Sequence, residues 1–140
     1  MRNLLTRSAV AAVAVAGFIA PAAAASAAPA GGWGPPIELV LTTYSSTNKL
    51  GAEDARNLGT NGRDGFWQSF TTNTYTANGD LQLKVKYVPH DTFPSGELVG
   101  LGTVETMEKC EAAGQLGVHN SLFGDYQCRP GFRAYILSAR

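Results

Sequence analysis

The chain has 140 residues, with 11 basic and 11 acidic side chains, and 44% of its residues are hydrophobic. This length suits one domain with a packed core. Because the charge is balanced and no basic cluster is present, the sequence offers little electrostatic attraction for the phosphates of a nucleic acid. We therefore expect no nucleic acid among its partners.

The first residues predict a secretory signal peptide. A positive start, with Arg2 and Arg7, precedes an apolar run that is too short to span a bilayer. Small residues at positions 25–27 mark the preferred cleavage site, so that residues 1–27 form the signal peptide, and cleavage after Ala30 is the alternative. We expect the mature protein to be secreted and extracellular, with no membrane segment.

Removal of the signal peptide leaves nine basic and eleven acidic residues, a net charge of −2. Residues 28–36 are rich in glycine and proline and are expected to form a flexible leading segment. Residues 37–140 are expected to form a single small globular domain. No internal repeat is apparent after Pro36.

Cys110 and Cys128 are the only cysteines of the chain. In an oxidising compartment, an even number of cysteines in a small protein favours a disulfide. Zinc usually takes four ligands, and these cysteines with His119 supply three at an unfamiliar spacing. A redox pair would show Cys-x-x-Cys, which is absent. We expect a structural disulfide, no metal and no cofactor; free thiols and a metal site are the less favoured alternatives.

The residues around the cysteines predict what the disulfide joins. "TMEKCEAAGQLG" reads as a short helix capped by Thr106, with Cys110 on its apolar stripe and Gly114 or Gly117 at its end. "YQCRPGFRAYIL" reads as two extended stretches around a Pro-Gly turn. The disulfide should therefore pin the helix to a C-terminal hairpin.

The clearest signal elsewhere is "GFWQSFTTNTYTANGDLQLKVKYV", in which Asn78-Gly79 predicts a two-residue hairpin turn. In that register Phe70 lies opposite Tyr87. The same register predicts one core-facing row on the second strand: Leu81, Leu83, Val85 and Tyr87.

Two further strands are predicted from "IELVLTT" and "ELVGLGTV", and the polar stretch 44–65 has room for a short helix near residues 52–58. The expected fold class is α+β: a mainly antiparallel sheet with one short helix, disulfide-linked to a C-terminal hairpin.

Catalysis has little support in the sequence. His90 and His119 are isolated, and no serine lies in a Gly-x-Ser-x-Gly context. The carboxylates of Glu97, Glu105 and Asp125 could serve a glycosidase, but any secreted domain carries such residues. We assign no catalytic residue.

The aromatic residues offer a possible binding surface of Trp67, Tyr75 and Trp33. The hairpin register places Trp67 and Tyr75 on the face away from the core, where aromatic rings stack on sugars or anchor protein interfaces. The favoured alternative for Trp67 is burial under the stretch 44–65.

The stretch from Cys110 to Leu137, with "CEAAGQLG", "YQC" and "YIL", resembles the terminal module of uncharacterised small secreted proteins of high-GC Gram-positive bacteria. That resemblance implies no activity. "PPIELVLTT" is also similar to the secreted subtilisin-inhibitor family, but the two disulfides of that family cannot form with two cysteines.

Two functions are compatible with these features of the sequence. The first is a secreted, non-catalytic binding protein whose ligand is a protein or a cell-envelope component. The alternative is a small extracellular hydrolase with an unrecognised active site.

Overall fold

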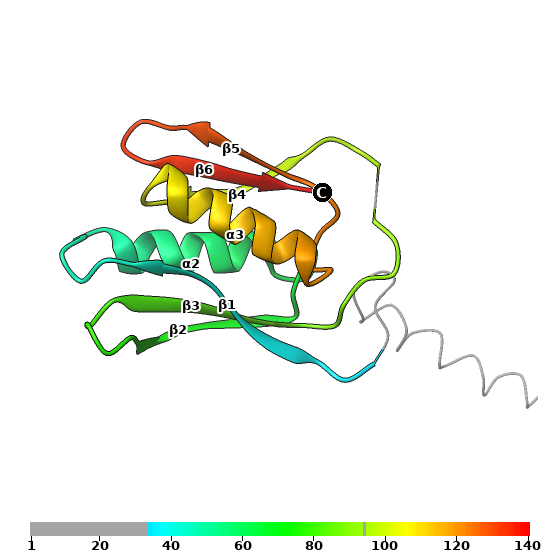
Figure 1. Cartoon of the computed structure of the whole chain (residues 1–140), viewed down its shortest axis with the longest axis horizontal. Coiled ribbons are helices and arrows are strands. Elements are labelled where there is room, and N and C mark those ends of the chain that lie inside the picture. Colours follow the sequence, from blue (N-terminus) through cyan, green and yellow to red (C-terminus); the bar gives the residue numbers. More distant parts are fainter. Residues whose placement is uncertain (1–33, 94) are drawn as a thin grey trace, which may run out of the picture.

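The computed structural model describes residues 34–93 and 95–140. Within them the strands and helices follow in this order: β1 (Ile37–Tyr44), α2 (Gly51–Gly62), β2 (Ser69–Tyr75), β3 (Leu81–Tyr87), β4 (Val99–Val104), α3 (Met107–His119), β5 (Tyr126–Pro130) and β6 (Tyr135–Ala139) (Figure 1). The predicted signal peptide, its cleavage sites and Trp33 lie outside the described residues.

The strands form two three-stranded antiparallel sheets, in the orders β1-β3-β2 and β4-β6-β5. Each sheet comes from one stretch of chain that runs strand, helix, hairpin. We call residues 37–87 the first unit and residues 99–139 the second unit. The α+β prediction is confirmed, but the sheet is divided in two, and α2 is a full 12-residue helix. The second unit repeats the topology of the first, although the sequence analysis found no internal repeat.

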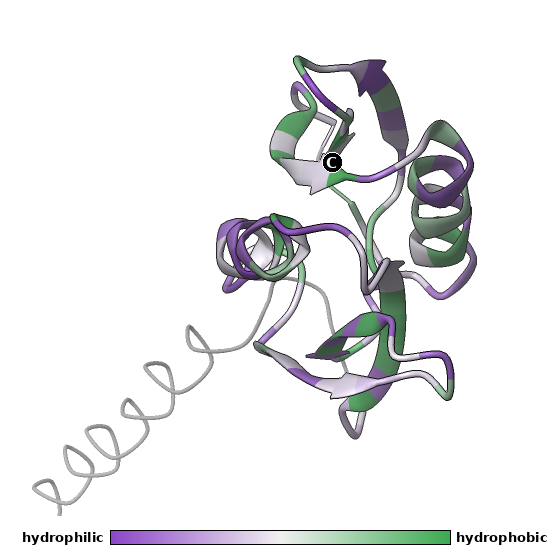
Figure 2. Cartoon of the chain, turned by 90° about the vertical axis from the view of Figure 1, so that its left-hand side faces the viewer, coloured by the Kyte–Doolittle hydropathy of each residue, from purple (hydrophilic) through white to green (hydrophobic). Residues whose placement is uncertain are grey.

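The two units share one core. Seen end-on in Figure 2, the two sheets lie above and below a common centre, and the two helices lie on opposite sides of it. Each helix packs on the hairpin of its own unit and on the first strand of the other unit, α2 on β4 and α3 on β1. Buried side chains from both units, including Leu41, Leu58, Leu101 and Leu137, belong to a single hydrophobic cluster. Burial of this shared cluster holds the units together.

Glycines in both helices admit the aromatic rings of the adjacent hairpins. A Cβ at Gly62 would lie 2.1 Å from the ring of Trp67, and one at Gly117 would lie 2.1 Å from the ring of Phe123. One turn earlier, Gly59 and Gly114 make the same close contacts with rings on β2 and β5. The sequence prediction that Gly114 or Gly117 ends the helix is therefore wrong: both are packing sites, and α3 continues to His119.

The β2–β3 hairpin has the predicted core face but not the predicted register. Its connection has three residues, because the Thr76 N–H donates to the carbonyl oxygen of Asp80, at 2.9 Å, and Gly79 has a φ of +87°. A bulge between Thr71 and Thr74 adds a second one-residue offset. Phe70 therefore lies opposite Val85 and not Tyr87. The two offsets sum to two residues, so the face that Phe70 presents to the core is unchanged.

The start of α3 and its disulfide are as the sequence predicts. The Thr106 hydroxyl accepts a hydrogen bond from the backbone N–H of Lys109, at 3.1 Å. Cys110 on α3 is bonded to Cys128 on β5, with their Cα atoms 6.0 Å apart. The glycines in the helices and the rings that pack on them align the two units with each other. In this alignment Cys110 corresponds to Ala55 of the first unit, and Cys128 corresponds to Thr72. The disulfide is thus a feature of the second unit alone.

Candidate interaction surface at the loop end

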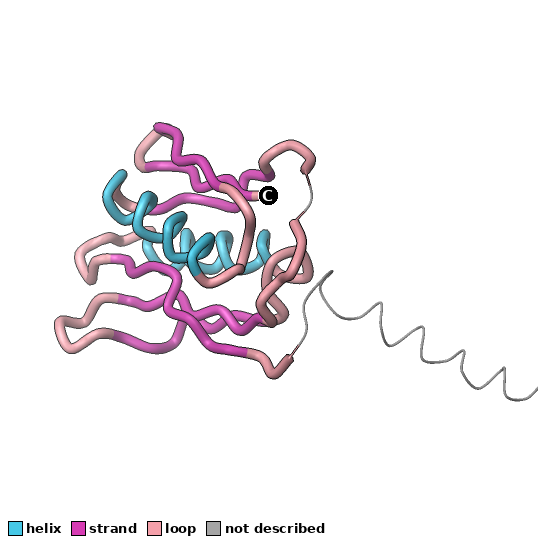
Figure 3. Tube along the Cα trace, turned by 45° about the vertical axis from the view of Figure 1, so that its right-hand side comes forward, coloured by secondary structure: helices cyan, strands magenta, loops and turns pink. Residues whose placement is uncertain are grey.

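One end of the molecule gathers the tips of both hairpins and the starts of both helices. Figure 1 and Figure 3 show this end on the left, where β1, β2, β4 and β5 end. We call it the loop end and define it as residues 45–50, 75–80, 105–107 and 130–134. The chain's C-terminus and the β3–β4 connection lie at the other end (Figure 1).

The β5–β6 hairpin carries an aromatic ring at its tip. The turn is closed by a hydrogen bond from the Gly131 N–H to the carbonyl oxygen of Ala134, at 2.7 Å. Between them, the side chain of Phe132 is fully exposed. The equivalent hairpin of the first unit has Ala77, Asn78 and Gly79 at its tip, with no aromatic ring. The exposed ring therefore distinguishes the second hairpin from the first.

The residue after Phe132 ties the hairpin tip to the first unit. The guanidinium of Arg133 donates two hydrogen bonds to the carboxylate of Asp54 in the first turn of α2, at 2.6 and 3.0 Å. Only 5% of the Asp54 side chain is exposed, against 42% for Arg133. The hydrogen bonds to Asp54 raise the pKa of Arg133 above its ordinary value. A bidentate pair of this kind fixes both distance and orientation.

The disulfide fixes the same hairpin through its first strand, β5, which carries Cys128. Cys128 lies two residues before Pro130, where β5 ends. The aromatic tip is thus held by a covalent bond to α3 on one side and by a bidentate ion pair to α2 on the other. Such a tip has little conformational entropy to lose when it binds.

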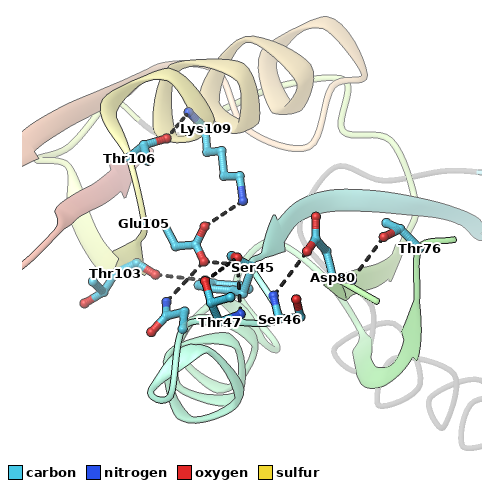
Figure 4. A network of polar contacts seen from close by, with 11 residues as sticks. Ser45, Ser46, Thr47, Thr76, Asp80, Thr103, Glu105, Thr106 and Lys109 are labelled. Carbon is cyan, nitrogen blue, oxygen red and sulfur yellow. Dashed lines mark hydrogen bonds and ion pairs between the residues drawn. The ribbon is translucent and has the colours of Figure 1, made fainter. Parts of the chain in front are cut away.

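A second polar cluster, around Glu105, joins the two units at the loop end (Figure 4). The Glu105 carboxylate accepts hydrogen bonds from the backbone N–H of Ser45, from the Asn48 amide at 3.2 Å and from the Lys109 ammonium at 2.6 Å. Ser45 and Glu105 each follow the first strand of their unit, so this contact joins equivalent positions. The cluster fixes the loop that leads into α2 against the start of α3.

The electrostatics of this cluster favour a charged Glu105. Burial alone raises its pKa, but the hydrogen bonds from Lys109, Ser45 and Asn48 outweigh that effect and bring the pKa below its ordinary value. Tyr44 beside it is fully buried and donates its hydroxyl to the carbonyl oxygen of Thr103, at 2.8 Å. Burial, with the charges of Asp54 and Glu105, raises the pKa of Tyr44. Both groups therefore have structural roles near neutral pH.

Further apolar side chains are exposed around the loop end. Tyr75, at the end of β2, is 63% exposed, as the sequence predicts, and a pocket of about 200 Å³ opens beside it. Leu50 precedes α2 and Met107 begins α3, and both are exposed. Together with Phe132 they make the loop end a surface of apolar side chains set among polar loops. Such surfaces are typical of interaction sites.

Trp67 is not part of any binding surface. Its side chain is fully buried, and its indole N–H donates to the carbonyl oxygen of Gly59 at 2.8 Å. The placement on the outer face is wrong because Trp67 lies before β2 begins, where strand alternation does not apply. Burial under the stretch 44–65 is the alternative that holds, since α2 covers the ring. Trp33, the third predicted residue, lies outside the described residues.

The two histidines line separate pockets. His119 is exposed at the end of α3, in a shallow pocket with Gln115 and Tyr126. His90 is buried in a pocket of about 310 Å³, and the described residues that line it include no serine and no carboxylate. Within residues 34–93 and 95–140, no group of three or more His, Cys, Asp or Glu side chains is arranged to hold a metal ion.

Phe132, Asp54 and Arg133 were not predicted from the sequence. For Phe132 a signal existed: "RPGFRA" places a large aromatic residue in a turn, where small or polar residues are expected. Asp54 and Arg133 carry no such signal, because they are 79 positions apart in the chain.

The comparisons with known proteins add no function. No family model matches the sequence, and no curated protein and no solved structure matches it either. None of the helices in the described part of the chain is long and apolar enough to cross a membrane.

Proposed function

We propose that the mature protein is a secreted, non-catalytic binding protein that docks on a protein partner through its loop end, with Phe132 as the anchor. The observation that carries this proposal is the fully exposed ring on a hairpin held by both a disulfide and a bidentate ion pair. Aromatic side chains, Phe among them, are enriched at the centres of protein interfaces.

The surroundings of Phe132 favour a protein over a lipid surface. The mature chain has a net charge of −2, which gives no attraction to anionic lipid headgroups. Leu50, Tyr75 and Met107 add apolar area at the same end, interspersed with polar loops. An apolar centre with a polar rim is the usual composition of a protein interface.

The C-terminus offers a way to test the surface, because it lies at the other end of the molecule (Figure 1). Protein immobilised through its C-terminus should capture a partner from the producer's culture supernatant or cell-wall extract. We expect Phe132→Ala to weaken that complex about thirtyfold or more, the loss typical of an anchor residue. Because the ring contacts solvent, Phe132→Ala should leave the free energy of unfolding within about 0.5 kcal/mol.

Val118→Ala provides a matched control, since it removes an exposed apolar side chain from α3 away from the loop end. This variant should bind as the wild type does. Equal affinity of Phe132→Ala and the wild type for the captured partner would contradict the proposal. So would binding of the wild type, but not of Phe132→Ala, to lipid vesicles in the absence of protein.

Secretion is tested separately. N-terminal sequencing of protein recovered from the culture medium should begin at Ala28, or at Gly31 if the alternative site is used. Recovery of an intact chain confined to the cytosol would contradict this part of the proposal while leaving the loop-end surface open to the binding test.

A further inference from the structure

The pocket that holds His90 lies at the end of the molecule away from the loop end, where the two units join. Phe66 and Leu122, which line it, follow α2 and α3 at equivalent positions of the two units. The remaining walls come mainly from His90, Thr92 and Phe93 of the β3–β4 connection. The pocket of about 310 Å³ thus exists only because the units are joined, and such junctions are where small ligands commonly bind.

Burial separates the floor of this pocket from its rim. Leu122 is fully buried and His90 nearly so, and the half-buried ring of Phe66 is held by an edge-on contact with Phe123, at 5.9 Å between ring centroids. Thr92 and Phe93 are exposed and form part of the rim. The rings of His90 and Phe93 are themselves 5.8 Å apart. A flat, apolar ligand group would be enclosed by ring faces and edges that are already in place.

A second depression of about 540 Å³, lined by charged as well as apolar residues, adjoins the pocket and shares Thr92 and Phe93 with it. Its lining includes Asp91 and Asp125 and one cation, Arg140. Arg140 is already committed, since it pairs with Asp125 at 3.0 Å and donates to the carbonyl oxygen of Gly96 at 2.9 Å. Among the side chains that line this depression, Asp91 is left as an unbalanced negative charge, which favours a positively charged ligand group.

We propose that this composite site binds a small aromatic amine, with the aromatic ring in the His90 pocket and the ammonium group beside Asp91. The ring is matched by the aromatic and aliphatic walls, and the ammonium group is matched by the excess carboxylate of the adjoining depression. The site is independent of the loop end, so that either could exist without the other.

The test uses three probes of similar size: 2-phenylethylamine, 2-phenylethanol and 3-phenylpropionate. Each is titrated into the full mature protein and followed by the NMR signals of His90, Thr92 and Phe93. For a ligand of this size we expect a dissociation constant on the order of 1 mM for the amine. The amine should bind about three- to fivefold more tightly than the alcohol, since a partly exposed charge pair contributes that much. The carboxylate should bind most weakly.

Two variants assign the parts of the site. Asp91→Asn should reduce the affinity for the amine to that for the alcohol, whereas Glu108→Gln, which removes an exposed charge from the first turn of α3, should leave their ratio unchanged. Phe93→Ala should weaken the amine and the alcohol alike by about fivefold or more. The proposal is overturned if none of the probes shifts these NMR signals at a concentration of about 20 mM, which is 20 times the dissociation constant expected for the amine. Equal binding of all three probes, or an amine preference that survives Asp91→Asn, would overturn it as well.

Discussion

Arg133 donates both arms of its guanidinium to the buried carboxylate of Asp54, and the residue immediately before it, Phe132, is the most exposed large hydrophobic side chain among the described residues. A buried carboxylate is costly unless it is paired. Here the pairing orders the one hairpin tip that carries an aromatic ring. The ion pair therefore joins α2 directly to the hairpin tip that exposes Phe132.

The two partners of this ion pair should respond unequally to substitution. Asp54→Asn leaves a half-exposed guanidinium that water can solvate, and we expect it to lower the free energy of unfolding by about 1 kcal/mol. Arg133→Met leaves the Asp54 carboxylate buried without its cation, so this variant should be the less stable of the two. Urea unfolding of both variants at pH 7 measures the difference. Equal losses would show that Asp54 is solvated in the folded protein.

Glu105 should make stability depend on acid pH. Its folded-state pKa lies below the ordinary value of 4.5, so its contribution is fully present above about pH 4.5 and is lost as the pH falls through the folded pKa. Glu105→Gln should therefore cost about 1 kcal/mol at pH 7, and the difference from the wild type should shrink as the pH falls below about 4.5.

Glu108→Gln is the control for that titration, because Glu108 is exposed in the first turn of α3. Its stability should follow the wild type across the same pH range. A constant difference between Glu105→Gln and the wild type from pH 7 to pH 3 would mean that the hydrogen bonds to Glu105 do not depend on its charge.

Some of this architecture could be predicted from the sequence because its signals are local. Alternation along β3 gives the buried row, and Thr106 followed by a helical stretch gives the start of α3. The disulfide was predicted from the expected compartment and the number of cysteines. Each of these inferences depends on residues within a few positions of one another or on a single possible pairing.

The rest depends on contacts between distant segments. The division into two sheets is set by how α2 packs on β4 and α3 on β1, and no periodicity within one element encodes that choice. One of the two offsets in the β2–β3 register comes from the longer turn, in which the Thr76 hydroxyl accepts from the Asp80 N–H; the other comes from the bulge between Thr71 and Thr74. The repeat itself is visible in retrospect as a Gly-x-x-Gly spacing in both helices, at Gly59 and Gly62 and at Gly114 and Gly117.

Those glycines should be intolerant of alanine to different degrees. Alanine usually stabilises a helix relative to glycine by about 1 kcal/mol. At Gly62, however, the added methyl group would collide with Trp67, which is fully buried and cannot move aside. We expect Gly62→Ala to destabilise the protein by about 3 kcal/mol, the upper range for an overpacked core.

Gly114→Ala should cost less, about 1 kcal/mol, because the ring of Tyr126 is only partly buried and can shift toward solvent. Gly96→Ala, where nothing lies within 4 Å of the added atom, is the neutral reference. Thermal unfolding of the three variants gives the order. If Gly62→Ala were as stable as Gly96→Ala, the close contact between α2 and Trp67 would be wrong.

The contribution of the disulfide to stability can be tested by replacing its two cysteines with the residues at the equivalent positions of the first unit. Cys110→Ala combined with Cys128→Thr places in the second unit the residues that the first unit has at the equivalent positions, Ala55 and Thr72. The bond closes a loop with a sequence separation of 18, which corresponds to about 3 kcal/mol of stability in the chain-entropy model. We expect the double variant to lose about 2–4 kcal/mol in urea unfolding while retaining its fold, since the first unit packs without such a bond.

Thiol titration of the denatured, unreduced wild type should find no free thiol. Full stability of the double variant, together with loss of partner binding, would instead assign the cysteines to function.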